Sequence, residues 1–232
     1  MKFIWEGLKQ AVRLILQGDP DILEVVVLTL KVSGFATLIS VMIGIPLGLC
    51  VAMANFRGKK AIISLVNAGM ALPPTVAGLW VSLFLWRNGP FGSLGLMYTP
   101  PAMVIAQAII AIPIVTGLTM AAVQQLNPKL KLQILALGAS PLQLWWLLLR
   151  ECRFGLMGAI MAGLGRVIAE VGASMAVGGN ILHETRVLTT SIVLEIRKGQ
   201  FDVAIALGFV LMALSYGITA LLTMFQQKRQ KV

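Results

Sequence analysis

The stretch LALGASPLQLWW, residues 135–146, places a Gly-Ala-Ser-Pro turn between two short apolar segments. A membrane-spanning helix needs about 20 apolar residues, so the turn interrupts the stretch before any helix could cross a bilayer. The pattern predicts one helix that starts at Asn127-Pro128 and a second helix over residues 142–149. Such a hairpin packs back on its own bundle or fits a groove on a partner protein, and the pattern alone leaves both alternatives open.

The composition of the whole chain indicates a membrane protein. Of its 232 residues, 58% are hydrophobic and only 12% are charged, whereas soluble domains carry about 25% charged residues. Five longer apolar runs cover residues 22–55, 61–86, 100–124, 154–178 and 201–225. They predict an all-α integral membrane protein with about five transmembrane helices. The first run would extend about 51 Å as a helix. We therefore expect it to tilt or to bend at Pro46.

The charged residues predict how the chain lies in the membrane. Residues 1–20 are expected to form an amphipathic helix in the interface plane, and residues 21–228 the transmembrane domain. Ten of the 19 lysines and arginines lie in residues 56–60, 127–153 or 228–231, and seven lie on the opposite side. The positive-inside rule then places the N-terminus outside and the C-terminus in the cytoplasm. Because the net charge of +10 is scattered among apolar runs, it fits an anionic membrane surface better than nucleic acid.

A stripe of small residues, Ser40, Gly44, Gly48 and Ala52, repeats every four positions in the first run. Small residues allow helices to approach closely. The stripe therefore packs inside the chain or against a second copy. A dimer is expected in either case, since five spans are too few to enclose a pathway.

The fourth apolar run contains polar residues at a helical spacing. Arg166, Glu170, Ser174 and Gly178 recur every four positions, which places them on one face of a continuous helix. Ionisable residues at membrane depth normally face the protein interior or an aqueous path. Two compatible hypotheses follow, a structural Arg166–Glu170 pair and a stripe that lines a translocation path.

Three further features of the apolar runs bear on function. A proline inside a span leaves a backbone carbonyl without its helical partner, which favours either a kink with a packing role or the wall of a cavity. The second group of path candidates is therefore Pro73, Pro74, Thr75 and Pro113. Lys31, near the outer part of the first run, is expected to extend its amine to the interface. Beyond the fourth run, residues 188–195 are expected to form a short helix in an external stretch over residues 179–200.

The hairpin resembles the cytoplasmic coupling loop of bacterial ABC-importer permeases, whose pattern is Glu-Ala-Ala, three residues, Gly, nine residues, then Ile-x-Leu-Pro. LGAS at residues 137–140 matches, although the glutamate and the terminal proline of the pattern are absent at residues 132 and 151. IGIPLG (43–48) and ALPPTVAGL (71–79) resemble molybdate, tungstate and sulfate permeases. GRVIAEVGASMAVGGNILHETRVLTTSIVLE (165–195) is most similar to the tungstate branch.

This resemblance implies a type I ABC-importer permease fold, with a second copy of the chain, two ATP-binding ABC subunits and an external oxyanion-binding protein as partners. ATP would bind the partner ATPase, since this chain has no phosphate-binding loop. The coupling loop, about residues 127–149, would dock on that ATPase through Leu137, Gly138, Ala139, Ser140 and Pro141. The external stretch would face the binding protein, with contact candidates Asn180, Arg186, Thr189 and Thr190.

The function predicted from the sequence is therefore the membrane subunit of an ATP-driven oxyanion importer in a bacterial or archaeal cytoplasmic (inner) membrane. Tungstate is favoured over molybdate and sulfate. A membrane scaffold without transport is the alternative from another class, although a charged stripe at membrane depth would then have no use. No catalytic or metal-binding residues are predicted, because the chain has no H-E-x-x-H motif and no Ser/Lys or Asp/Asp pair at suitable spacing.

Overall fold

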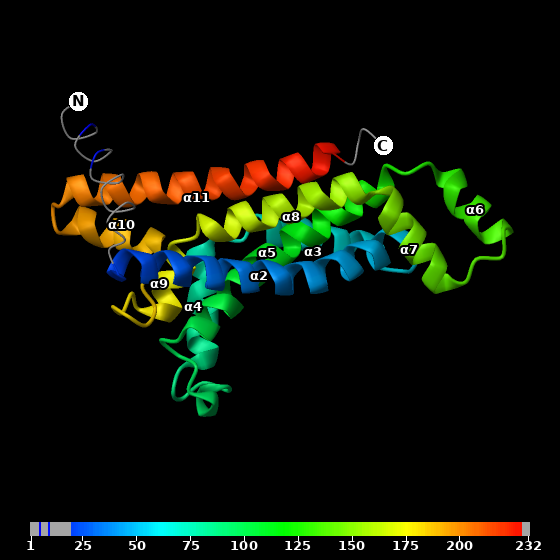
Figure 1. The fold of residues 1–232 in the computed structure, drawn as a ribbon. Helices are drawn as coiled ribbons and strands as arrows, with labels where there is room; N and C mark the ends of the chain where they lie inside the picture. Colours follow the sequence, from blue (N-terminus) through cyan, green and yellow to red (C-terminus); the bar gives the residue numbers. More distant parts are fainter. Residues whose placement is uncertain (1–4, 6–8, 10–19, 229–232) are drawn as a thin grey trace.

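The described part of the chain, residues 5, 9 and 20–228 of a computed structural model, is built from helices (Figure 1). The predicted interfacial helix of residues 1–20 lies almost entirely outside the described residues. The elements are α2 (Pro20–Met53), α3 (Lys59–Met70), α4 (Pro74–Leu85), the short 3-10 helix η1 (Gly92–Leu94), α5 (Pro100–Gln124), α6 (Pro128–Ala136), α7 (Pro141–Glu151), α8 (Arg153–Ile168), α9 (Gly172–Gly178), α10 (Leu188–Arg197) and α11 (Phe201–Lys228).

The long helices lie lengthwise in one bundle. Helix α2 packs along α5, α8 packs on both of them, and α11 packs on α8 (Figure 1). Helices α6 and α7 lie at one end of the bundle, and α9 and α10 lie at the other. In the described range, three helices are long and apolar enough to cross a membrane, or five spans if each of two bent helix pairs counts as one. The prediction of an all-α membrane protein with about five spans is therefore confirmed.

Proline determines where several helices begin. Four helices, α4 to α7, carry proline in their first turn, where the missing N–H breaks no helical hydrogen bond. Pro46 and Pro113 instead lie inside α2 and α5, and both helices continue through them. Helix α2 therefore continues through Pro46 without interruption, and its expected tilt or bend in the membrane stays a prediction.

Two predicted spans are bent pairs rather than single helices. The run 61–86 divides into α3 and α4, which meet at 99°. Pro73 lies between them in an extended conformation, as expected for a residue that precedes another proline. The run 154–178 divides into α8 and α9, which meet at 57°.

The small-residue stripe of α2 faces α5 of the same chain. A Cβ atom at Gly44 would lie 2.9 Å from the Val115 side chain, and one at Gly48 would lie 2.6 Å from the carbonyl oxygen of Thr116. Ser40 adds a hydrogen bond to the carbonyl of Ala108 at 3.4 Å. Of the two alternatives for this stripe, the structure supports packing within the chain.

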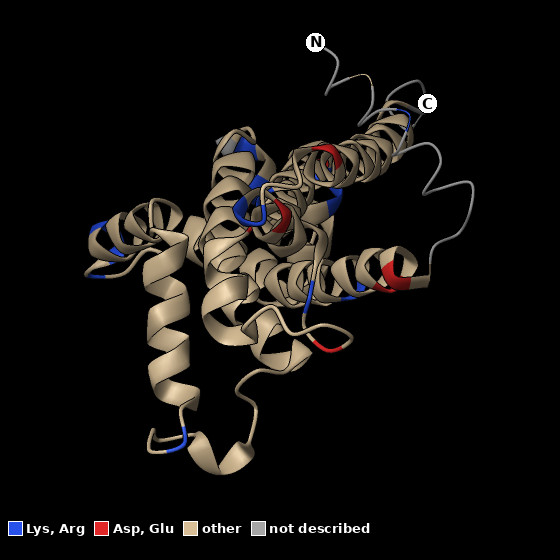
Figure 2. Ribbon diagram, turned by 90° about the vertical axis from the view of Figure 1, so that its left-hand side faces the viewer, with Lys and Arg blue, Asp and Glu red and all other residues tan. Residues whose placement is uncertain are grey.

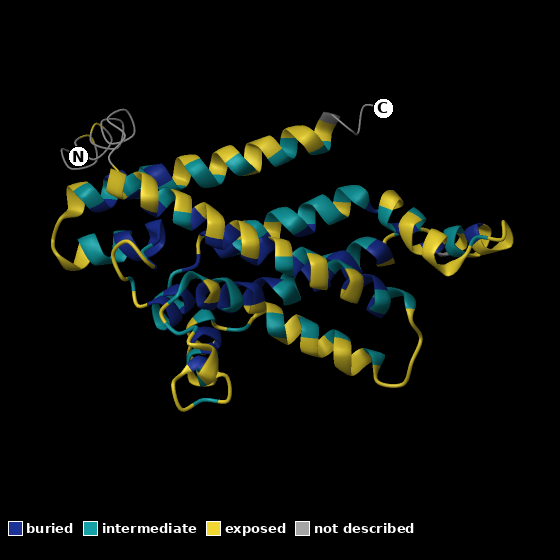
Figure 3. Ribbon diagram, turned by 60° about the horizontal axis from the view of Figure 1, so that its bottom comes forward, coloured by how far each residue is buried: buried dark blue, intermediate teal, exposed yellow. Residues whose placement is uncertain are grey.

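Burial and charge divide the bundle into regions. Buried residues gather along α2, α5 and α9, whereas α3, α11 and the α6–α7 hairpin are largely intermediate or exposed (Figure 3). Helix α4 leaves the bundle crosswise and carries no charged residue (Figure 2). Its outward face is apolar and exposed, with Leu79, Trp80, Leu83 and Phe84.

Candidate functional site: the terminal hairpin and the α8–α9 break

Local hydrogen bonds define the hairpin between α5 and α8. The Asn127 side chain caps α6 by accepting from the backbone N–H of Lys129. The Ser140 hydroxyl caps α7 by accepting from the Gln143 N–H, and the Gln143 side-chain oxygen accepts from the Ser140 N–H, which completes a capping box. Gly138 has φ +79°, a conformation that favours glycine. The predicted helix–turn–helix is confirmed in both its caps and its turn.

The hairpin has one face toward the bundle and one face away from it. Leu144 and Leu148 are buried in an apolar cluster with Leu49 of α2 and Val123 of α5. The opposite surface exposes Leu137 (88%) and Leu142 (79%) at the tip, and Trp146 farther along α7. The structure therefore confirms that the hairpin packs on its own bundle, and its exposed apolar surface leaves the fit to a partner as a prediction.

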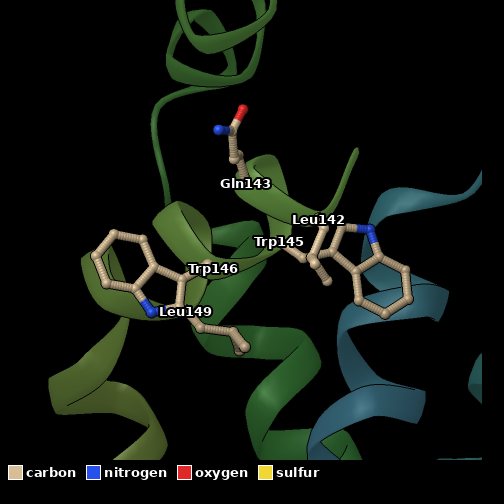
Figure 4. A pocket seen from close by; sticks show the side chains of 5 residues that line it. All are labelled: Leu142, Gln143, Trp145, Trp146 and Leu149. Atoms are coloured by element: carbon tan, nitrogen blue, oxygen red, sulfur yellow. The ribbon is translucent and has the colours of Figure 1, made fainter. Parts of the chain in front are cut away.

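A hollow of about 480 Å³ lies on that exposed surface. Leu142, Gln143, Trp145, Trp146 and Leu149 line it, and the two indole rings extend to opposite sides of α7 (Figure 4). The guanidinium of Arg150 lies 5.4 Å from the Trp146 ring centre. Large exposed apolar side chains beside a hollow are typical of a protein-binding surface.

At the other end of the fourth run, Glu170 forms the centre of the α8–α9 break. One carboxylate oxygen accepts from the backbone N–H of Ala173 at 3.0 Å, in the first turn of α9. The other lies 3.5 Å from the Arg166 guanidinium. The Thr189 hydroxyl, from α10, donates to the Glu170 carbonyl oxygen at 2.9 Å. Glu170 thus links α8, α9 and α10.

The predicted stripe on one continuous helical face is wrong, because residues 169–171 interrupt the helix. Arg166 lies on α8, Glu170 in the break, and Ser174 and Gly178 on α9. The carboxylate cap on α9 replaces the helical hydrogen bonds that a continuous span would make there. The Arg166–Glu170 contact itself is present, with the Glu170 side chain 4% exposed and that of Arg166 36% exposed. Arg166 therefore faces the outside of this chain, while Glu170 is enclosed.

Helices α4 and α5 complete the surroundings of the break. The Thr75 methyl group lies 2.6 Å from where a Cβ of Gly172 would be, and a Glu170 oxygen lies 3.7 Å from the same point. Ser174 is fully buried and accepts a hydrogen bond from Gln107 of α5 at 2.8 Å. Thr75, Arg166, Glu170 and Ser174 thus gather around one site, with Pro73 and Pro74 directly before Thr75.

Pro113, the remaining path candidate, lies elsewhere. Its ring would be 2.9 Å from a Cβ at Gly69, so it packs where α3 crosses α5. It also lines an apolar groove of about 200 Å³ between α2, α3 and α5. Pro113 therefore packs between helices, which agrees with the alternative that this proline has a packing role.

The external stretch contains α10, which begins at the predicted Leu188 and ends two residues beyond the predicted Glu195. Thr189 and Thr190 are buried in the chain, so neither hydroxyl is open to a docking protein in this conformation. Asn180 and Arg186 are partly exposed, and the Arg186 guanidinium donates to the Asn180 carbonyl at 3.4 Å. Of the four contact candidates, the structure places these two at the surface.

Three polar residues around the break escaped the sequence interpretation. Gln107 holds Ser174, Ser82 of α4 donates to the Ala176 carbonyl at 3.0 Å, and Thr29 of α2 accepts from the Leu188 N–H at 2.9 Å. The sequence does contain an indication for Gln107, since a lone amide in an apolar run normally needs a polar partner. No such indication exists for Ser82 and Thr29, because small hydroxyl residues occur throughout apolar helices and bond to their own backbone.

The fold is that of a type I ABC-importer permease. The chain belongs to the family of binding-protein-dependent transport system inner membrane components, whose model matches residues 44–231. It is thus an inner membrane protein and a non-catalytic transport subunit.

Individual relatives match over nearly the whole chain. The tungstate uptake system permease protein TupB of Peptoclostridium acidaminophilum is 38% identical over 98% of this chain and 100% of that protein. TupB of Campylobacter jejuni is 35% identical over 93% of this chain and 90% of that protein. A chain of the MetNI methionine ABC transporter in an inward-facing conformation has a TM-score of 0.74 at 19% identity, covering 90% of this chain and 95% of that one. This structural match supports the fold alone.

Proposed function

We propose that two copies of this chain form the translocation path of an ATP-driven tungstate importer, together with two ATPase subunits and an external tungstate-binding protein. The observation that carries the coupling role is the capped α6–α7 hairpin, which exposes Leu137, Leu142 and Trp146 outside the bundle. The choice of tungstate is supported by the TupB relatives. ATP is bound and hydrolysed by the partner subunits.

The arrangement of the helix ends supports the proposed orientation in the membrane. The hairpin, the basic segment before α3 and the C-terminal end of α11 all lie at one end of the bundle (Figure 1). In the proposal, this end faces the cytoplasm, where an ATPase can reach it. The α10 end, with Asn180 and Arg186, faces the external binding protein.

Helix α8 connects the two ends. It follows α7 directly and spans 16 residues to the Arg166 region, about 24 Å at the α-helical rise. A displacement of the hairpin by the ATPase therefore moves α8 as a rigid rod against the break. Because Thr189 of α10 holds the Glu170 carbonyl, docking of the binding protein near α10 acts on the same break from outside.

Arg166 is proposed to attract the passing dianion. Its charge is balanced by Glu170 at 3.5 Å, so the site attracts an anion without a deep cationic well that would trap it. Thr75 lies beside the same break, with its methyl group against Gly172. The path then lies where the exposed side of Arg166 faces the second copy.

The test is uptake by proteoliposomes that contain this chain, its ATPase and its binding protein. We expect ATP-dependent uptake of tungstate, with slower uptake of molybdate and sulfate. If uptake prefers molybdate or sulfate, the proposed importer function stands and the proposed substrate changes. A complete complex that moves none of the three anions contradicts the proposal. Leu142→Glu should lose uptake at least tenfold while the permease remains folded in the membrane.

A further inference from the structure

An apolar groove of about 550 Å³ runs between the N-terminal halves of α2 and α5. Phe35, Ile39, Val104 and Ile105 form much of its wall, and Lys31 is the single charged residue that lines it. Lys31 is exposed on the outer face of α2, two turns from the exposed Glu24, whose carboxylate contacts His183. Within the described residues, the structure gives Lys31 no hydrogen bond or ion pair.

The depth of Lys31 matches one edge of the hydrocarbon core. At the other end of α2, the Lys59 amine donates to the carbonyl of Ala52 at 3.1 Å, which marks one cationic level along the helix. From Ala52 back to Lys31 there are 21 residues, about 32 Å at 1.5 Å per residue. A hydrocarbon core is about 30 Å thick. The two lysines therefore lie near the two edges of the hydrocarbon core, from which a lysine side chain can extend to the headgroup phosphates.

We propose that this groove binds an anionic phospholipid, with the headgroup phosphate on the Lys31 amine and one acyl chain along Phe35 and Ile39. The groove offers an apolar wall to the acyl chain and an unpaired cation to the phosphate. It is separate from the hairpin and the break, and it requires only that α2 span the membrane.

A second copy of the chain fits the groove less well. One outward apolar helix available for such a contact is α4, which carries no charged residue. Seating α4 against the groove would enclose Lys31 without a counter-charge, and an unpaired enclosed charge is strongly destabilising. A phosphate supplies the missing negative charge.

Photocrosslinking in the assembled transporter tests the proposal. The variant Phe35→p-benzoylphenylalanine is reconstituted in vesicles that contain equal amounts of phosphatidylglycerol and phosphatidylcholine with identical acyl chains. Adducts are identified by mass. A basic residue near the surface favours anionic lipid by about 1 kcal/mol, or about fivefold. We therefore expect about five phosphatidylglycerol adducts for each phosphatidylcholine adduct.

Matched variants assign the preference to Lys31. Lys31→Gln should reduce the ratio to about one, and Lys31→Arg should keep it. The same photoreactive residue at Met42, which is 67% exposed on the same helix but outside the groove, should label both lipids equally. Equal labelling at position 35, or a preference unchanged by Lys31→Gln, overturns the proposal. An adduct to a second copy of the chain also overturns it and assigns the groove to a protein interface.

Discussion

The turn between α6 and α7 and the break between α8 and α9 both interrupt an apolar stretch, yet different forces hold them. Gly138 in the turn has φ +79°, and no heavy atom lies within 4 Å of where its Cβ would be. Gly172 in the break has the Thr75 methyl group 2.6 Å from the corresponding point. The turn is therefore formed by its own residues, and the break by residues from three other helices.

This difference matches the proposed roles. A self-sufficient hairpin keeps its shape when an ATPase pulls on it, because its caps lie within α6 and α7. A break held by contacts from α4, α5 and α10 responds to movement of any of them. The first transmits a displacement, and the second converts it into a change at Arg166 and Glu170.

The largest expected effect comes from splitting the ion pair at the break. Arg166→Gln leaves the enclosed Glu170 carboxylate without its cation and should cost about 3–5 kcal/mol. Glu170→Gln should cost less, because the remaining Arg166 is 36% exposed and is able to turn outward. The double variant should recover most of the loss. The measurement is a double-mutant cycle on unfolding of the purified complex in mixed micelles.

The surface pair Lys198–Glu195 provides the control for this cycle. Its N–O distance is 2.8 Å, but Lys198 is largely exposed. Neutralising Lys198 should therefore cost under about 1 kcal/mol. If the Arg166 and Glu170 substitutions had additive effects near zero on the free energy of unfolding, the structural pair would be contradicted. Full uptake by the double variant would instead contradict the proposal that Arg166 attracts the anion.

The second prediction concerns contact at Gly172. Gly172→Ala places a methyl group against Thr75 and should cost about 1–3 kcal/mol by overpacking. Thr75→Ser removes the methyl group of Thr75, so the double variant should regain most of that stability. Unfolding of the four proteins in the same micelles measures the coupling. If Thr75→Ser gave no recovery, the break would be set by its own backbone, as the turn is.

The sequence predicted the hairpin well because turn chemistry is local. Gly138, Ser140 and Pro141 act on residues within three positions, so their effect is readable from the chain alone. It predicted the Arg166–Glu170 contact for the same reason, since four residues separate them. The break was missed because Thr75 and Thr189 reach it only in the folded bundle. A period of four suggested a continuous helix, and a buried carboxylate that caps α9 overrode it.

The third prediction tests the self-sufficiency of the turn. Gly138→Ala must hold a Cβ-bearing residue in a left-handed conformation, which should cost about 1 kcal/mol. Gly138→Asn should cost less, because asparagine adopts this conformation more readily. Hydrogen exchange over residues 128–151 reports the change. Equal effects of alanine and asparagine would mean that space, rather than backbone conformation, limits this position.

The smallest effect is expected outside both interruptions, where the loop before α10 meets α2. The His183 ring nitrogen lies 2.7 Å from a Glu24 carboxylate oxygen. This hydrogen bond, with weaker attraction from Glu24 and Asp21 and opposition from Arg186, raises the pKa of His183 above its ordinary 6.5. The contact therefore stabilises the loop fully below the unfolded pKa, and its contribution is lost as the pH rises through the raised, folded pKa.

Because the chain has one histidine, a single imidazole resonance in a histidine-labelled sample reports this titration. We expect a pKa above 6.5 in the wild type and a lower value in Glu24→Gln, which keeps a hydrogen-bonding group and removes the charge. Glu184→Gln, a neighbouring change in the same loop, is the control and should leave the titration nearly unchanged. An identical pKa in the wild type and Glu24→Gln would show that Glu24 does not hold the loop. The loop before α10 would then owe its position to its other hydrogen bonds, among them those of Thr29 and Thr185.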